Sequence, residues 1–134
     1  MSDEYELKQV VTEPDHYAQF CISQGIKVGN LVFVSGQVAL GEDASIVGKG
    51  DFPAQIEQAF LNLSRVLQSA GSDLSKVAKV TIFLVNMKEH FGYVRQARAK
   101  YFSVPYPADT IVEVKSLYHP DVLIEIEAIA VAAT

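Results

Sequence analysis

The sequence has one cysteine, no tryptophan and no long uninterrupted apolar run. The single thiol, Cys21, excludes a disulfide within the chain and fits a reducing compartment. Because Cys21 lies in an apolar, strand-like run, we expect a buried and unreactive thiol. The apolar runs are shorter than the ~20 residues of a membrane-spanning helix, and the acidic residues 1–6 lack the features of a signal peptide. We therefore expect a cytoplasmic protein that does not enter a membrane.

Basic residues are also scarce. The chain has 11 Lys and Arg against 16 Asp and Glu, a formal net charge of −5. Nucleic-acid binding needs a clustered basic surface. Here only Arg95, Arg98 and Lys100 come close together, which predicts the solvated side of a helix and argues against nucleic acid as the main partner. No group of His, Cys and acidic residues has metal-ligand spacing, so we expect neither a metal nor a cofactor.

The chain of 134 residues has the usual length of one domain, which we expect over residues 1–134. Residues 1–17 predict an arm or an edge segment. The pair Gly29-Asn30 separates two β-type runs, 18–28 and 31–34, and predicts a hairpin. The second run is apolar on both faces and continues into Ser35-Gly36-Gln37, where glycine lets the backbone bend or a ligand approach.

The clearest helix begins after Asp51, a candidate N-cap, and ends before Gly71. A strand over 74–85 follows, then a second helix over 89–102. Two further strands, 107–114 and 122–131, are separated by turn residues. The order β-β-α-β-α-β-β predicts an α+β fold: two layers, a mixed sheet with two helices on one face. The other face keeps apolar residues, so we expect a homo-oligomer that covers it.

The last strand carries two acids among apolar residues. Glu125 and Glu127 point to one side, whereas Ile124 and Ile126 point to the other. A buried carboxylate is costly without a partner. Two interpretations stay open at this point: the acids mark a solvated face or structural ion pairs, or one of them lines a cleft and transfers protons.

Several segments together resemble the RidA superfamily, also called YjgF/YER057c/UK114 and endoribonuclease L-PSP. They occur in unbroken order between residues 22 and 131: KVGNLVFVSGQ at 27–37, LQSAG at 67–71, VAKVTIFL at 77–84, YPA at 106–108, VEV at 112–114 and IEIEAIA at 124–130. No single segment is diagnostic, but six in the same order identify the chain as a member.

The resemblance implies a chorismate-mutase-like fold and a homotrimer with three clefts between subunits. It also implies hydrolysis of reactive imines and enamines derived from amino acids, without metal or cofactor. In that scheme backbone groups at Ser35 and Gly36 line the site, Ile111 contacts the ligand, and Glu125 positions or activates water. Imine hydrolysis needs an attacking water and a proton donor at nitrogen, and one carboxylate can supply both functions.

The chain also departs from the pattern of the deaminating members. They read Pro-Ala-Arg at the start of the strand that corresponds to 107–114 here, and their arginine binds the substrate carboxylate, whereas this chain has Asp109. Ile22 replaces a tyrosine, Arg95 replaces an asparagine, and a longer loop brings in Tyr118 and His119. A carboxylate facing an anionic substrate turns attraction into repulsion, so a small 2-imino acid should bind poorly.

Two explanations of these departures stay open. Arg95 takes over the anion-binding role, with Asp109 pairing to it or binding a substrate amine, or the pocket serves another ligand or binding alone. Of the histidines, His90 and His119 are candidate bases, but at a helix start and in a loop they are more often exposed and structural. The sequence thus favours an imine or enamine hydrolase, then a non-catalytic metabolite-binding or stress-related protein, and last an endoribonuclease.

Overall fold

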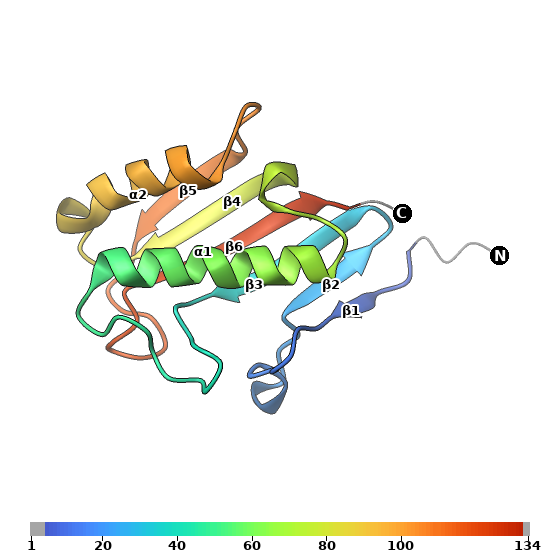
Figure 1. Cartoon of the computed structure of the whole chain (residues 1–134), viewed down its shortest axis with the longest axis horizontal. Helices are drawn as coiled ribbons and strands as arrows, with labels where there is room; N and C mark the ends of the chain where they lie inside the picture. Colours follow the sequence, from blue (N-terminus) through green and yellow to red (C-terminus); the bar gives the residue numbers. More distant parts are fainter. Residues whose placement is uncertain (1–4, 133–134) are drawn as a thin grey trace.

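The computed structural model describes residues 5–132 and has two layers, a six-stranded sheet and two helices that lie across one of its faces (Figure 1). This arrangement confirms the predicted α+β fold. The strands are β1 (Lys8–Val10), β2 (Gly25–Val28), β3 (Leu31–Gln37), β4 (Val77–Leu84), β5 (Ala108–Glu113) and β6 (Ile124–Val131). The helices are α1 (Phe52–Ser69) and α2 (Met87–Tyr101), with short 3₁₀ helices η1 (Ala18–Phe20) and η2 (Leu74–Lys76).

The sheet is mixed, with the strand order β1-β2-β3-β6-β4-β5. Only β4 and β5 run parallel; the other neighbours are antiparallel. The last strand in the sequence, β6, therefore lies between β3 and β4 in the centre, and β5 forms one edge (Figure 1). The opposite edge is β1, which agrees with the predicted edge segment; residues 1–4 of that prediction lie outside the described residues.

The local signals in the sequence account for the hairpin and for α1. Val28 pairs with Leu31 across the two-residue turn, and Gly29 has a φ of 56°, which favours glycine. Asp51 accepts a hydrogen bond from the backbone N–H of Ala54 at 3.1 Å and so caps α1. Gly71, with a φ of 81°, follows the helix end. The prediction for both elements is thereby confirmed.

The core lies between the sheet and the helices. Alternate residues of β6 point into it: Ile124, Ile126 and Ala130 are fully buried. Gln55 of α1 is also fully buried, and its side-chain amide ties the ends of two loops together. It donates to the carbonyls of Gly48 and Asp121, and accepts from the N–H of Leu123. Because these hydrogen bonds pair both ends of the buried amide, Gln55 fixes the backbone of the loop before β6.

The other face of the sheet stays open in a single chain. Phe33, Val112 and Val131 alternate with core residues on their strands and remain 42%, 41% and 45% exposed. Glu125 and Glu127 share this face, as the alternation in β6 predicts. No helix within residues 5–132 is long and apolar enough to span a membrane.

Three local predictions are wrong. The run 18–28 is a strand only from Gly25 onward, because residues 18–20 form a 3₁₀ turn that ends at Cys21. Cys21 has a φ of 62° and is exposed rather than buried, because the chain reverses there before it enters the sheet. His90 was expected at an exposed helix start, yet only 13% of its side chain is accessible. Its ring stacks on Phe52 with centroids 4.0 Å apart, and its Nδ1 contacts the carbonyl oxygen of Val85.

Candidate functional site

The candidate site begins at an irregularity in β3. Val34 pairs with Ala128 of β6, but the next pair is Gln37 with Ile126, so β3 carries one extra residue at Ser35-Gly36. Such a bulge bends a strand and reorients its side chains. Ser35 is tied down by two hydrogen bonds to the segment before β2, from its N–H to the carbonyl of Gln24 at 2.9 Å and from its hydroxyl to that of Ser23 at 2.6 Å.

Gly36 lies directly against the carboxylate of Glu125. A Cβ atom on Gly36 would lie 2.6 Å from both Cδ and Oε2 of Glu125 and 2.7 Å from Cγ. Real Cβ atoms do not approach other atoms so closely, so the bulge needs glycine to admit the Glu125 side chain. The sequence predicted that Gly36 lets the backbone bend or a ligand approach. The strand is irregular there, and the group that lies against Gly36 is the Glu125 side chain of the same chain.

Glu125 has an electrostatic environment that suits proton transfer. Burial disfavours its charged form and raises the pKa of this carboxyl above its usual range, and the negative charge of Glu127 raises it further. Among residues 5–132 no Lys, Arg or His lies within ion-pair distance of Glu125. A half-buried carboxylate without a counter-ion exchanges its proton at a higher, more nearly neutral pH than a free glutamate.

Two tyrosine phenols lie close enough to Glu125 to respond to its charge. Burial, then the charge of Glu125, raises the pKa of Tyr17. The same two causes, in the same order, raise the pKa of Tyr118, which is 66% exposed on the loop before β6. Tyr17 also donates a hydrogen bond of 2.6 Å from its hydroxyl to the carbonyl of Gly36. Both phenols therefore stay protonated at neutral pH beside the carboxylate.

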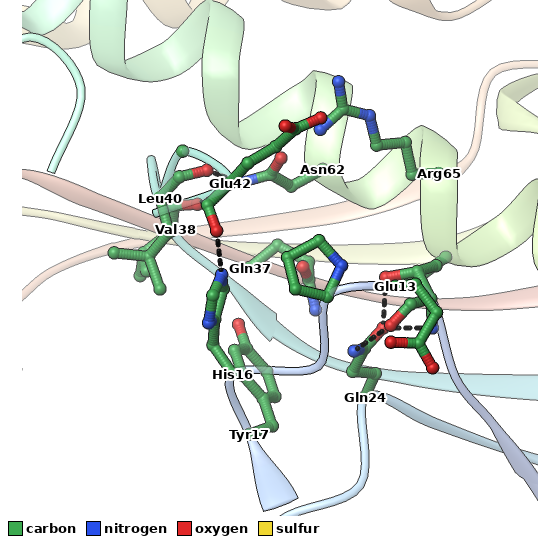
Figure 2. A pocket seen from close by; sticks show the side chains of 14 residues that line it. Glu13, His16, Tyr17, Gln24, Gln37, Val38, Leu40, Glu42, Asn62 and Arg65 are labelled. Atoms are coloured by element: carbon green, nitrogen blue, oxygen red, sulfur yellow. Dashed lines mark hydrogen bonds between the residues drawn. The ribbon is translucent and has the colours of Figure 1, made fainter. Parts of the chain in front are cut away.

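Tyr17 belongs to residues 12–17, which we call the arm segment. Figure 2 shows Glu13, His16 and Tyr17 of this segment beside Gln24 and Gln37, around a small pocket. The buried side chain of Gln24 binds the segment through both ends of its amide. Its Oε1 accepts from the N–H and the hydroxyl of Thr12, and its Nε2 donates to the carbonyl of Thr12. His16 adds a 2.8 Å contact from its Nε2 to the carbonyl oxygen of Glu42 (Figure 2).

The second group of predicted site residues surrounds Asp109 on the edge strand β5. Arg98 of α2 binds the Asp109 carboxylate with two hydrogen bonds, from Nε at 2.9 Å and from Nη2 at 2.6 Å. This fork corrects the expectation that Asp109 would pair with Arg95. Arg98 lies one turn after the buried Val94 and so points toward the sheet, whereas Arg95 is exposed. Arg98 is therefore not part of a fully solvated face either.

The structure places these two groups on opposite sides of the sheet within one chain. Asp109 pairs with Val80, a core residue on the helix side, and Ile111 also packs toward the core. Glu125 pairs with Phe83, which points to the open side. Of the predicted residues, Ser35, Gly36 and Glu125 therefore lie together. Ile22 lies near them, since its N–H donates to the carbonyl of Tyr17 at 3.3 Å. Asp109, Ile111 and Arg95 lie apart from this site.

Sequence reasoning missed Tyr17 and Arg98. A weak signal existed for Arg98, which follows Val94 by four residues and so borders the apolar stripe of α2. Nothing local pointed to Tyr17, because its contact is with a glycine nineteen residues further along the chain. No group of three or more His, Cys, Asp and Glu suited to a metal ion occurs within residues 5–132. The carboxylate, phenol and backbone groups gathered at Glu125 can transfer protons and form hydrogen bonds.

Comparisons with known proteins cover nearly the whole chain. The sequence profile of the family described as Endoribonuclease L-PSP matches residues 12–132. A RutC family protein of Pyrococcus abyssi is 40% identical over 108 residues, which are 81% of this chain and 84% of that protein. The 2-iminobutanoate/2-iminopropanoate deaminase of Dermatophagoides farinae is 33% identical over 109 residues, 81% and 84% of the two chains. The solved structure of protein YjgH superposes with a TM-score of 0.85 at 32% identity, over 96% of this chain and 98% of that one.

Proposed function

This chain belongs to the endoribonuclease L-PSP family, the RidA/YjgF/UK114 superfamily, and on that premise we propose that it hydrolyses the C=N bond of a small imine or enamine. The observation that carries the proposal is Glu125, a half-buried carboxylate without a counter-ion among the described residues. It rests on Gly36 and has a raised pKa. The resemblance to a relative named as an imine deaminase supports the same reaction class.

The proposed reaction uses Glu125 twice. Water adds to the imine carbon while the carboxylate of Glu125 takes one proton from it and passes that proton to the imine nitrogen, which gives a carbinolamine. Glu125 then takes the hydroxyl proton of the carbinolamine and delivers it to the nitrogen, so that the C–N bond breaks, ammonia leaves and the C–O bond becomes a carbonyl. Overall, one imine and one water give one carbonyl compound and one ammonia. A carboxyl group with a raised pKa suits both directions of transfer, since its pKa lies nearer the working pH.

We further propose that the substrate lacks the carboxylate of a 2-imino acid. The chain has an acid, Asp109, where the deaminating relatives that the sequence resembles carry arginine. The nearby cation, Arg98, already forms two short hydrogen bonds with that acid. The pair is close to neutral, so it offers an anionic substrate little attraction. Within one chain this pair lies across the sheet from Glu125, so we propose that a neighbouring copy of the chain brings it to the site, where neutral imines and enamines fit better than 2-iminopropanoate does.

We also propose that the open face of the sheet is covered by further copies of the chain in a homotrimer, with the Glu125 site at the boundary between copies. The exposed Phe33, Val112 and Val131 support this assembly, since such side chains on one sheet face favour a protein partner. Light scattering after gel filtration should give about three times the mass of 14.7 kDa. Phe33→Asp should reduce that mass, and a wild-type monomer would contradict the assembly.

The decisive experiment follows imine decay in two coupled assays. An amino-acid oxidase generates anionic 2-imino acids, an amine oxidase generates neutral imines, and semicarbazide traps what remains. We expect wild-type protein to accelerate decay, more for the neutral imines, and Glu125→Gln to lower kcat at least about 100-fold. Glu57→Gln is the matched control, because it removes an exposed carboxylate from the outer side of α1.

The remaining outcomes separate the other functions. Saturable binding of these compounds without turnover would replace the hydrolase with a non-catalytic metabolite-binding protein. Equal acceleration by wild type and Glu125→Gln would remove Glu125 from the mechanism. RNA cleavage that survives purification and disappears in Glu125→Gln would favour an endoribonuclease, although the net charge of −5 argues against binding a polyanion.

A further inference from the structure

We propose that the arm segment, residues 12–17, is part of the active site and that Tyr17 is a positioning residue for Glu125 and for the attacking water. The inference rests on the proposed function, and it assigns to the N-terminal region a part in the reaction. Its basis is a continuous set of contacts that runs from a buried amide, through the arm segment, to the glycine against which Glu125 lies.

The contacts begin at Gln24, only 4% exposed. Besides its three hydrogen bonds to Thr12, its Nε2 donates to Oδ1 of Asp15 at 3.0 Å. The same Asp15 oxygen accepts from the backbone N–H of Tyr17 at 2.9 Å. Asp15 is thus held from two sides, which lowers its pKa, first through Gln24 and then through Tyr17. One buried amide therefore fixes the backbone position of Tyr17.

The contacts end at the phenol of Tyr17. Its hydroxyl donates to the carbonyl of Gly36, at 2.6 Å, and so holds the bulge. The Glu125 carboxylate lies against the same residue, since a Cβ on Gly36 would be 2.6 Å from its Cδ and Oε2. Since phenol and carboxylate rest on the same residue, a change in the position of the Gly36 peptide moves the surface that orients Glu125.

The arrangement also assigns a hydrogen-bonding role to the phenol oxygen. Its proton is committed to the Gly36 carbonyl, so the lone pairs of the oxygen remain available as acceptors. An attacking water has two protons and needs two acceptors. Glu125 takes one proton, and the Tyr17 oxygen accepts a hydrogen bond from the other, which leaves a water lone pair directed at the imine carbon.

The first test is kinetic and uses the imine that wild-type protein turns over fastest. Tyr17→Phe keeps the ring and removes the oxygen; we expect kcat to fall at least tenfold while KM changes less than threefold. Tyr106→Phe, which alters a tyrosine that is 64% exposed on the loop between α2 and β5, should stay within twofold of wild type. Asp15→Ala should lower kcat at least fivefold, whereas Asp15→Asn keeps an acceptor for the Tyr17 N–H and should restore most of it. A kcat within twofold of wild type for Tyr17→Phe would overturn the proposal.

The second test needs no activity. With ¹³C at the tyrosine Cζ position, the Tyr17 resonance, assigned by its loss in Tyr17→Phe, is followed by NMR between pH 3 and 9. We expect an inflection where Glu125 titrates, absent in Glu125→Gln and present in Glu57→Gln. Asp15 adds an earlier inflection that Glu125→Gln leaves in place. If wild-type protein hydrolyses no imine but the Glu125 inflection is seen, the proposed reaction is wrong while the placement of Tyr17 beside Glu125 is supported. If the chemical shift of Tyr17 shows no inflection that depends on Glu125, the inference is overturned.

Discussion

The two sides of the sheet hold two carboxylates in opposite situations. Asp109 receives two short hydrogen bonds from one guanidinium. Glu125 has no Lys, Arg or His in ion-pair distance within residues 5–132, and the like charge of Glu127 acts on it. The first acid has a cationic partner, whereas burial and the charge of Glu127 raise the pKa of the second.

This difference shows that the role of an acid in the sheet depends on the charged groups around it, and not on the residue type alone. The same functional group is structural at Asp109, where its charge is neutralised by Arg98. It is chemically available at Glu125, where the glycine bulge brings the carboxylate against the backbone and two phenols lie close enough to respond to its charge. The variants below change one side at a time.

Among the variants that compare the two sides of the sheet, the largest effect is expected from Gly36→Ala. The new Cβ would lie 2.6 Å from the Glu125 carboxylate, so the side chain must move by an ångström or more. Because a misplacement of this size costs roughly 100-fold in rate, we expect kcat to fall about 10- to 100-fold with little change in folding. Gly92→Ala in α2 is the matched control, since a Cβ there meets open space. That variant should gain about 0.5–1 kcal/mol of stability and keep full activity; equal activity of the two variants would show that Gly36 does not constrain Glu125.

On the other side of the sheet, Asp109→Asn should chiefly affect stability. It leaves the Arg98 guanidinium partly buried without its counter-charge, so we expect the free energy of unfolding to fall by about 1–2 kcal/mol in urea denaturation. Glu57→Gln breaks the ion pair between Glu57 and Lys100. Both of these side chains are largely exposed, so the free energy of unfolding should change by less than about 0.5 kcal/mol. A loss for Asp109→Asn no larger than that of Glu57→Gln would mean that the fork is weak in solution.

The same Asp109→Asn variant also tests the substrate class. Once the carboxylate of Asp109 is removed, Arg98 carries an uncompensated positive charge near the position where related deaminases bind an anion. We expect KM for 2-iminopropanoate to fall about three- to tenfold, roughly 1 kcal/mol, while KM for a neutral imine stays the same. The measurement is the coupled semicarbazide assay with both substrates. An unchanged KM for the anion would separate Arg98 and Asp109 from substrate binding altogether.

The fold was predictable because its signals are local. Asp51, Gly71 and the pair Gly29-Asn30 act on neighbouring residues, and the alternation in β6 assigns Glu125 to a face without any knowledge of its neighbours. For the same reason the two acids Glu125 and Glu127, and a bend or close approach at Gly36, could be derived from the residues alone, whereas the choice of Glu125 rested on the family resemblance.

The partners of these residues were not predictable. Whether Arg95 or Arg98 meets Asp109 depends on the rotation of α2 about its axis, which is set by packing of Val94 and Ala97. Tyr17 reaches Gly36 only because Cys21 adopts a left-handed conformation and turns the chain back. The strand predicted over 18–28 would have carried Tyr17 away from the bulge. Long-range contacts of this kind follow from the assembled fold and leave no periodic trace in the sequence.

The smallest expected effect is a pH shift in Glu127→Gln. The charge of Glu127 contributes to the raised pKa of Glu125, so its removal should lower that pKa toward the ordinary value. Because Glu125 acts as a base in its ionised form, the acidic limb of the kcat/KM profile should move to lower pH by a fraction of a unit.

The effect of Glu127→Gln on the free energy of unfolding has a fixed sign as well. An acid with a raised folded-state pKa favours folding while it is protonated, and this contribution is lost as the pH rises through the folded-state value. Glu127→Gln should therefore raise the free energy of unfolding slightly at neutral pH. It should leave that free energy unchanged below the ordinary glutamate pKa, where Glu125 is protonated in both the folded and the unfolded chain. A shift of the acidic limb of the kcat/KM profile to higher pH would contradict the effect of Glu127 on Glu125.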